Sequence, residues 1–301
     1  MGRIKYNLPV IVDFHTHIFP AKVRDNRAEY LRDPAFAALY SGPKAAIATD
    51  EDLIASMDRD GIDASVALGF GWRSHELCVE TNDYVLEAAG RYPGRIIPFC
   101  AVQPLAQEAA LREIERCLEG GARGIGELRA DEQSFSLDDE RVMAPLAELA
   151  RLSGLPLLLH TSEPVGHTYA GKGTATPEVL YRFISCFPEV KLILAHWGGG
   201  LAFYALMPEV ADALKNTYFD TAASPLLYRW DILAHVSRIV GEDKVLFGSD
   251  YPLLKPARLI RAIKGIGLLG QHLNHVLGGN AQRILGLGAE TRAAAPPLER
   301  L

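Results

Sequence analysis

The feature that most constrains the fold of this chain is a short apolar run followed by a helix-like segment, repeated eight times. Runs rich in Val, Ile and Leu are typical of strands that are buried on both faces of a parallel sheet. The predicted strands cover residues 8–17, 65–69, 95–102, 122–128, 156–160, 190–196, 217–221 and 244–248. The segments between them predict helices over about 50–60, 76–91, 106–119, 138–153, 177–187, 201–214 and 227–240, with a last one from about 257.

Eight such units predict an α/β fold of one kind, the (β/α)8 TIM barrel. Right-handed crossovers between parallel strands, repeated eight times, can close into a ring, and about 250 residues suffice for it. The alternative is an open doubly wound sheet, which normally has a glycine-rich phosphate turn after its first strand. Here that turn is His15-Thr16-His17, which favours the barrel. We expect one domain over 1–288, a lid-like insertion at about 18–50 and a flexible tail at 289–301.

Charge and cysteine usage limit the kind of partner. The 301 residues include 31 basic and 37 acidic side chains, and the net charge of −6 offers no surface for nucleic acid or an anionic membrane. The four cysteines are scattered, which argues against a disulfide framework and a thiolate zinc site. No stretch approaches the roughly 20 apolar residues that span a bilayer, and the start shows no signal peptide. We expect a cytoplasmic protein with a small-molecule substrate, and leave a homodimer open.

Side chains that can bind a metal ion stand at the ends of five predicted strands. They are His15, His17, Glu127, His160, His196 and Asp250. In such a barrel the carboxyl ends of the strands meet at one mouth, where active sites are built. Each residue alone has an ordinary explanation, as a hydrogen-bonded histidine or a turn-forming aspartate. Together these nitrogen and oxygen donors predict a divalent transition metal, for which we expect zinc, with manganese, iron or nickel as alternatives.

Glu127 is the member of this set with two interpretations. Its carboxylate lies inside the apolar run 122–128, where an unpaired charge would cost several kcal/mol. Either a metal ion or an ion pair with Arg129 or Arg123 would compensate that charge. The residues alone leave both open.

Five motifs, taken in order, resemble those of a known family. They lie at residues 13–20, 159–160, 195–199, 248–252 and 278–285. On these motifs, which span nearly the whole chain, the sequence resembles the amidohydrolase superfamily of metal-dependent (β/α)8 barrels. Within it, the resemblance is to the amidohydrolase-related branch that includes aminocarboxymuconate-semialdehyde decarboxylase. As an ordered set the motifs are specific to the superfamily, and they are much less specific to a substrate.

The resemblance implies roles for these residues. His15, His17 and Asp250 would bind the more buried metal ion, whereas His160 and His196 would bind a second ion or, in one-metal members, the substrate and the hydrolytic water. Many two-metal members bridge their ions with a carboxylated lysine, which the fourth strand lacks. Its Ile-Gly-Glu-Leu is similar to the Ile-Gly-Glu-Ile of the TatD-like nucleases, in which the glutamate is a metal ligand. Glu127 is therefore the candidate bridge, and we expect one or two ions.

The expected chemistry is hydrolysis by a metal-activated water. A bound divalent ion lowers the pKa of its water to about 7 and polarises the oxygen under attack. Asp250 would act as general base and acid, and His196 would stabilise the oxyanion. We expect a metal-dependent hydrolase of a small amide, ester or lactone. The alternatives are non-hydrolytic decarboxylation of an aromatic or unsaturated carboxylic acid, and a metal-binding scaffold without turnover.

Several side chains next to these strand ends are candidates for substrate contacts. They are Trp72, Arg73, Arg129, His167, Trp197 and Tyr251. Arg73 and Arg129 would suit a substrate with a carboxylate, because a guanidinium pairs with a carboxylate through two parallel hydrogen bonds. The alternative for each residue is a solvated loop charge or an aromatic ring packed on the barrel rim.

Overall fold

A computed structural model describes residues 10–268 and 270–287; the tail expected at 289–301 lies outside them. All eight predicted strands are present and parallel, although most are shorter than the apolar runs that predicted them. Their bounds are β1 Val12–His17, β2 Ala64–Leu68, β3 Ile96–Pro98, β4 Ile125–Leu128, β5 Leu157–Leu159, β6 Leu192–Leu194, β7 Thr217–Asp220 and β8 Val245–Leu246.

Hydrogen bonds close these strands into a ring. Strands β1 to β3 pair in chain order, and so do β4 to β8. The amide of Gly126 donates to the carbonyl of Cys100 at 2.7 Å, which joins the end of β3 to β4. The amide of Phe14 donates to the carbonyl of Phe247 at 2.7 Å, which joins β1 to β8. The predicted (β/α)8 barrel is therefore confirmed.

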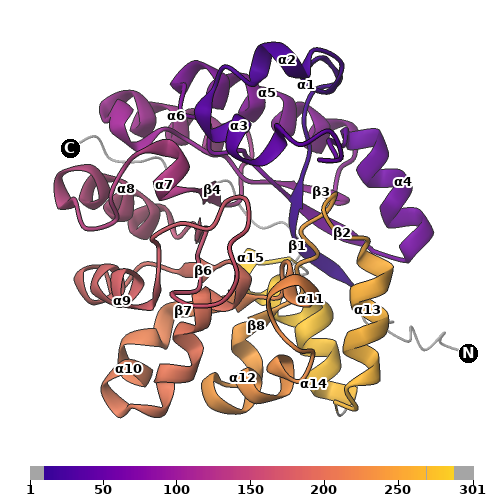
Figure 1. Ribbon diagram of the computed structural model, residues 1–301, viewed down its shortest axis with the longest axis vertical. Helices are drawn as coiled ribbons and strands as arrows, with labels where there is room; N and C mark the ends of the chain where they lie inside the picture. The colour runs from indigo at the N-terminus through magenta and orange to yellow at the C-terminus, as the bar shows by residue number, and fades with distance from the viewer. Residues whose placement is uncertain (1–9, 269, 288–301) are drawn as a thin grey trace, which may run out of the picture.

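Helices form a ring around the strands (Figure 1). Their bounds are α4 Asp50–Asp60, α5 His75–Arg91, α6 Glu108–Glu119, α8 Glu140–Ser153, α9 Pro177–Cys186, α10 Pro208–Ala213, α12 Ile232–Val240 and α13 Pro256–Gly265. The helix predicted over 201–214 is wrong in its first half. An irregular 3-10 stretch, His196–Leu206, comes first, and α10 begins at Pro208, whose fixed φ suits the first turn of a helix.

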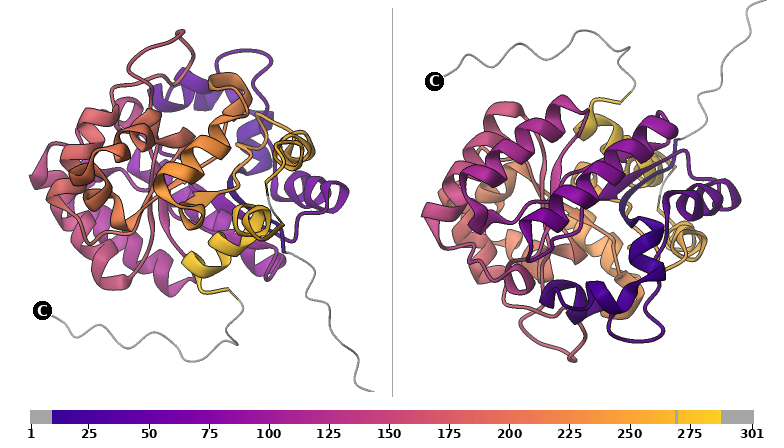
Figure 2. Two further views of the ribbon diagram at one scale, coloured as in Figure 1. Left: turned by 90° about the horizontal axis from the view of Figure 1, so that it is seen from below. Right: turned by 90° about the horizontal axis from the view of Figure 1, so that it is seen from above.

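The segment between β1 and α4, for which the sequence showed no clean period, contains three short helices. These are α1 Ala21–Asp25, α2 Arg27–Tyr30 and α3 Pro34–Tyr40. Further short helices are α7 Ala130–Gln133, α11 Ser224–Leu227, α14 Gly270–Asn274 and α15 Asn280–Leu285. The insertion lies at the same end of the barrel as the loop after β5, and α15 lies toward the opposite end (Figure 2).

The buried apolar residues form three clusters. One fills the barrel and includes Phe14, Phe99 and Ile193. The largest lies between the strands and the surrounding helices. The third, which we call the insertion cluster, packs α3 against the loop after β2 and consists of Phe19, Val23, Ala35, Phe36, Tyr40, Ile47, Phe70, Trp72 and Cys78. Burying each large apolar side chain contributes about 1.5–3 kcal/mol, so the insertion is firmly attached to the barrel.

None of the helices within residues 10–268 and 270–287 combines the length and the apolar character that a membrane span needs.

The start of α4 shows how local sequence sets an element. The Thr49 hydroxyl accepts from the amide of Asp52, and the Asp52 carboxylate accepts from the amide of Thr49, which is a capping box. At the other end Gly61 ends the helix with φ 72°, a left-handed conformation that favours glycine. The helix predicted over 50–60 is therefore confirmed.

Asp50 ties the end of the insertion to α5. Its buried carboxylate accepts hydrogen bonds from Tyr84 and Arg91, both at 2.7 Å. Burial opposes ionisation, but the bonds from Tyr84 and Arg91 outweigh it and lower the pKa of Asp50. A lowered pKa adds stability above the pH at which an unfolded aspartate titrates, about 4, and that stability is lost as the pH falls through the folded pKa.

We expect Asp50→Asn to lower the free energy of unfolding by about 1–2 kcal/mol at pH 7, because two donors lose a charged acceptor. The loss should be smaller at pH 3, because part of the stability that the lowered pKa adds above about pH 4 is no longer present there. Urea denaturation at both pH values measures it. Asp58→Asn, which breaks an exposed ion pair with Arg95, is the control and should cost no more than about 1 kcal/mol. Equal losses at pH 7 and pH 3 for Asp50→Asn would contradict the assignment.

Candidate metal centre

The structure brings the six predicted metal-binding side chains together at the mouth of the barrel. His15 and His17 lie on β1 and Glu127 on β4, whereas His160, His196 and Asp250 follow β5, β6 and β8. Two groups of three have their ligand atoms within 4.8 Å of one another: His15 with His17 and Asp250, and His15 with Glu127 and His196. That these residues bind metal remains a prediction, and their geometry can be tested against it.

The first group surrounds the end of β1. The Nε2 atoms of His15 and His17 lie 3.1 Å apart, and Asp250 Oδ1 lies 3.8 Å from the former and 3.7 Å from the latter. Two ligands that are each about 2.1 Å from one ion lie about 3.0–3.4 Å apart. These spacings are therefore close to those of a shared divalent ion.

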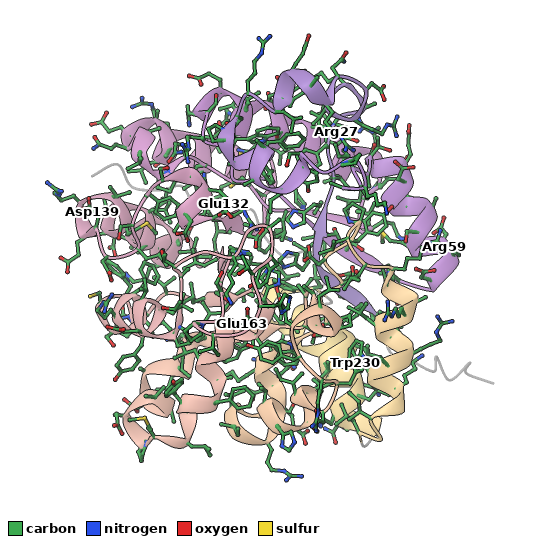
Figure 3. The ribbon with its side chains drawn as sticks, viewed as in Figure 1. Arg27, Arg59, Glu132, Asp139, Glu163 and Trp230 are labelled. Carbon is green, nitrogen blue, oxygen red and sulfur yellow. The ribbon has the colours of Figure 1, made fainter. Side chains whose placement is uncertain are left out.

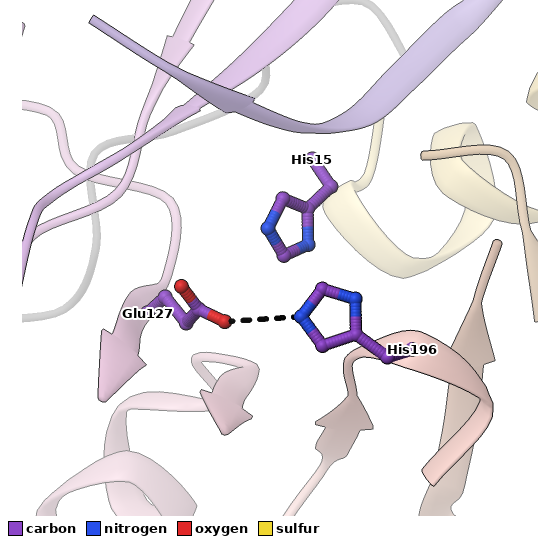
Figure 4. A group of neighbouring side chains, drawn as sticks. All are labelled: His15, Glu127 and His196. Carbon is purple, nitrogen blue, oxygen red and sulfur yellow. Dashed lines mark ion pairs between the residues drawn. The ribbon is translucent and has the colours of Figure 1, made fainter. Parts of the chain in front are cut away.

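The second group spans the mouth, with His15 on β1, Glu127 on β4 and His196 after β6 (Figure 4). Glu127 Oε1 is 3.7 Å from His196 Nε2 and 2.9 Å from His160 Nδ1. His196 Nε2 is 3.1 Å from His160 Nδ1. Glu127 also accepts from Arg129 Nη1 at 3.0 Å, so the ion pair considered from the sequence is present. The same carboxylate faces the inward imidazoles, and both interpretations of Glu127 are therefore compatible with its position.

Groups outside the cluster orient three of the histidines. His15 Nδ1 lies 2.7 Å from Asp220 Oδ2, His196 Nδ1 lies 3.2 Å from the carbonyl of Ala222, and His160 Nε2 lies 2.9 Å from the carbonyl of Gly171. Because these oxygens only accept, each outer nitrogen donates its proton to one of them, which leaves the inner nitrogens for a ligand at the centre. There they face one another, two carboxylates and, at His160 Nδ1, the guanidinium of Arg129 at 2.9 Å. A divalent ion would displace any proton on these inner nitrogens and bind their lone pairs, so the residues fit a divalent metal.

The local backbone explains why these side chains reach the mouth. Gly126 has φ 136°, and a Cβ there would lie 2.5 Å from the carbonyl oxygen of Leu158. The register of β4 against β5 shifts at this point, which directs Glu127 inward. His196 and Asp250 have φ of 55° and 63°. Such left-handed conformations are uncommon for residues with a Cβ and are concentrated at functional sites.

Charges within the cluster change the ionisation of its members. Burial lowers the pKa of His15, but the carboxylates of Asp220, Asp250 and Glu127 outweigh it and raise that pKa to about 10. Burial, with the charge of His15 next, lowers the pKa of His17 to about 4. Burial works against the charged form of Glu127, yet Arg129 and His160 hold its pKa well below the usual value. The carboxylates thus make this region favourable for positive charge.

A cavity of about 450 Å³ opens next to the cluster. His17, Glu127, Arg129, His160, His196 and Asp250 form its polar end. The remaining wall comes from α3, the loop after β5, and the segments after β7 and β8, and most of its side chains are apolar. Two cavity-lining residues, Arg129 and Tyr169, contact Glu132 and Glu163, which are labelled in Figure 3.

Of the six side chains predicted to contact substrate, two belong to the cavity lining. Arg129 and His167 line the cavity, whereas Trp72, Arg73, Trp197 and Tyr251 do not. The two Trp side chains are fully buried, and their indole N–H groups donate to Thr81 and Ser224. Arg73 donates to the carbonyl of Glu132. The side chains of Trp72 and Trp197 thus belong to the packed interior, whereas Arg73 is exposed and Tyr251 half-buried. Contact of any of the six side chains with substrate stays a prediction.

Two residues of the site were missed from the sequence. Asp220 ends β7 and bonds His15, and Tyr40 of α3 lines the cavity. Asp220 followed the rule that singled out the other residues, a polar side chain at the end of a predicted strand, and could have been found by applying it to 217–221. Tyr40 had no such signal, because it lies in a segment with no clear period.

Fold and site together define a (β/α)8 barrel with a cluster of candidate metal ligands at its mouth. The family model described as Amidohydrolase matches residues 12–287, and the chain belongs to this family. The predicted amidohydrolase resemblance is therefore confirmed, and the protein is an enzyme of the amidohydrolase superfamily.

Named relatives are decarboxylases. The 2-amino-3-carboxymuconate-6-semialdehyde decarboxylase of Dictyostelium discoideum is 24% identical, over 92% of this chain and 91% of the relative. The gamma-resorcylate decarboxylase of Polaromonas sp. strain JS666 is 23% identical, over 65% of this chain and 74% of the relative. The solved 5-carboxyvanillate decarboxylase of Novosphingobium aromaticivorans, complexed with manganese and 4-hydroxy-3-methoxy-5-nitrobenzoic acid, has a TM-score of 0.74 at 20% identity and covers 92% of this chain and 96% of its own.

These relatives correct the expected reaction. The prediction of a hydrolase of an amide, ester or lactone is wrong, because the relatives carry out decarboxylation, the alternative that the sequence had left open. The histidine and carboxylate side chains predicted a metal ion. They could not distinguish hydrolysis from decarboxylation, because the same ligands would hold the ion for either reaction. Zinc is likewise not supported over manganese, the metal of the solved relative.

We expect Asp220→Asn to weaken binding of Mn²⁺ about 10- to 100-fold, because His15 loses the carboxylate that holds its proton on Nδ1. Metal titration followed by calorimetry measures the affinity. Asp231→Asn, at an exposed position, is the control and should bind the ion as the wild type does. Unchanged affinity in Asp220→Asn would show that His15 is not a ligand or does not need this partner.

Proposed function

We propose that the protein is a metal-dependent, non-hydrolytic decarboxylase of an aromatic carboxylic acid. The observation that carries the proposal is the cluster of inward-facing imidazole and carboxylate groups at the polar end of a cavity with mostly apolar walls. Such a cavity can bury an aromatic ring while one end holds a carboxylate near a cation. The names of the relatives support the same reaction.

His15, His17 and Asp250 would hold the ion, with Glu127, His160 and His196 next to it. When bound, a divalent ion supplies positive charge that orients the substrate carboxylate and stabilises negative charge on neighbouring oxygens. We propose manganese, since oxygen and imidazole donors suit it and the solved relative contains it. Zinc is the alternative.

The reaction exchanges a carboxyl group for a proton. The bond between the ring carbon and the carboxyl carbon breaks, carbon dioxide leaves, and the electron pair remains on the ring carbon, which takes the proton. Asp250 lines the cavity with Oδ1 toward His15 and His17, and it would deliver this proton from Oδ2. His196 Nε2 would face the negative charge at the substrate, and the apolar walls would keep water away.

The reaction is tested with 2,6-dihydroxybenzoate and the Mn²⁺-loaded protein. We expect carbon dioxide release and, in D₂O, one deuterium on the product carbon that lost the carboxyl group. Asp250→Asn should lower the rate by at least about 100-fold, because the proton donor is removed. Mass spectrometry of the product and a coupled carbon dioxide assay measure both. Incorporation of ¹⁸O from labelled water into the product, without carbon dioxide, would contradict the proposal.

The metal is tested separately. Removing bound ions with a chelator should abolish carbon dioxide release, and Mn²⁺ should restore it more fully than Zn²⁺. Elemental analysis of the protein as purified gives the number and kind of ions. Full activity after exhaustive removal of metal would refute metal dependence, and restoration by Zn²⁺ alone would replace manganese by zinc.

A further inference from the structure

The cavity wall offers no free positive charge for a second acidic group. Arg129 is the one Lys or Arg among the cavity-lining residues in the described part of the chain. Its guanidinium is buried and already contacts Glu127 at 3.0 Å and Glu132 at 3.4 Å. Together with Asp250, these carboxylates outnumber it by two, so Arg129 is not available to pair with a second carboxylate of the substrate.

Two other cations near the mouth donate to backbone carbonyls. Arg27 donates to Gly42 and Ala45. Lys172 donates to Val165 and His167, on the loop after β5. A substrate carboxylate at the metal end therefore has a counter-charge, whereas a second carboxylate farther out would not. An unpaired charge against an apolar wall is strongly unfavourable.

Most of the other side chains that line the cavity are apolar. They include Leu39, Phe70, Leu226, Leu227 and Leu253. Tyr169 also lines the cavity, but its hydroxyl donates to Glu163 at 2.7 Å. His167 lies on an exposed part of the same loop, in contact with solvent.

Tyr40 supplies a neutral donor to this otherwise apolar cavity. Its ring is stacked on Phe36 at a centroid distance of 4.6 Å and packs edge-on against Phe19, so the insertion cluster holds it in place. It is 9% exposed and lines the cavity. Burial, with the charge of Asp250 next, raises the pKa of Tyr40, so the hydroxyl keeps its proton and can donate. Within the described residues it has no hydrogen-bond partner.

We propose that the site selects an aromatic monocarboxylic acid whose ring carries a neutral hydroxyl group for Tyr40, and that it rejects acids with a second carboxylate. This inference rests on the proposed decarboxylase function and narrows its substrate class. The relatives are named after acids of both kinds, since resorcylate has one carboxyl group and carboxyvanillate has two. The proposal assigns this chain to the first kind. Tyr40 acts as a specificity residue, since it touches the substrate away from the bond that breaks.

The charge argument is tested by calorimetry on the Mn²⁺-loaded protein with benzoate and isophthalate. We expect isophthalate to bind at least about tenfold more weakly than benzoate. Leu226→Arg places a cation in the outer wall at a position that is 49% exposed, where a long side chain is tolerated. In this variant isophthalate should bind about tenfold more tightly than in the wild type, with benzoate nearly unchanged.

Tyr40 is tested by the same measurement with 2,6-dihydroxybenzoate. Tyr40→Phe keeps the packed ring and should weaken this acid about three- to tenfold, while benzoate binds as before. The matched control is Tyr30→Phe, in a tyrosine that packs against the same cluster but does not line the cavity, and it should change neither affinity.

The outcomes separate this inference from the function on which it rests. Isophthalate binding as tightly as benzoate to the wild type, or an equal loss for both acids in Tyr40→Phe, overturns the selectivity and leaves the decarboxylase proposal standing. If none of the three acids binds the metal-loaded protein, the proposed function fails together with the inference. Carbon dioxide release from 2,6-dihydroxybenzoate but not from isophthalate would support both.

Discussion

Closure of the barrel between its first and last strands is the constraint on which the site depends. The amide of Asp250 donates to the carbonyl of His15 at 2.9 Å, and the amide of His17 donates to the carbonyl of Tyr251 at 2.7 Å. These bonds bring residues that are more than 230 positions apart in the chain to within ligand distance of each other. The candidate metal ligands therefore form one cluster only because the ring closes, so the site depends on the fold.

The order of elements could be predicted because its causes are local. Apolar runs such as 157–159 and 192–194 are too regular to be loops, and α4 carries its own cap at Thr49 and its own end at Gly61. Histidines at the ends of such runs follow from the same reading, since parallel strands place their carboxyl ends together. The periodicity of apolar residues and the positions of the strand ends were therefore sufficient to predict the barrel and the histidines at its mouth.

The insertion and the cavity wall could not be predicted in this way. The helices α1 to α3 are short and are held by tertiary packing around Phe36 and Trp72, which no local pattern reveals. The indole of Trp72 looked available for a substrate, and it is buried because its N–H finds Thr81 and its ring finds the insertion cluster. The candidate metal ligands also could not distinguish hydrolysis from decarboxylation. That choice depends on which substrates the cavity wall admits and whether it excludes water.

Gly171 connects the loop after β5, which lines the cavity, to the cluster of candidate metal ligands. Its carbonyl holds His160 through Nε2, and a side chain at this position would meet the guanidinium of Arg129 and the tip of Leu39. The loop, the insertion and the β4 end thus touch at one point that has no room for another atom. Lifting this loop to admit a ligand would release the His160 ring from its hydrogen bond, so the passage of molecules through the mouth and the aim of one imidazole are mechanically linked.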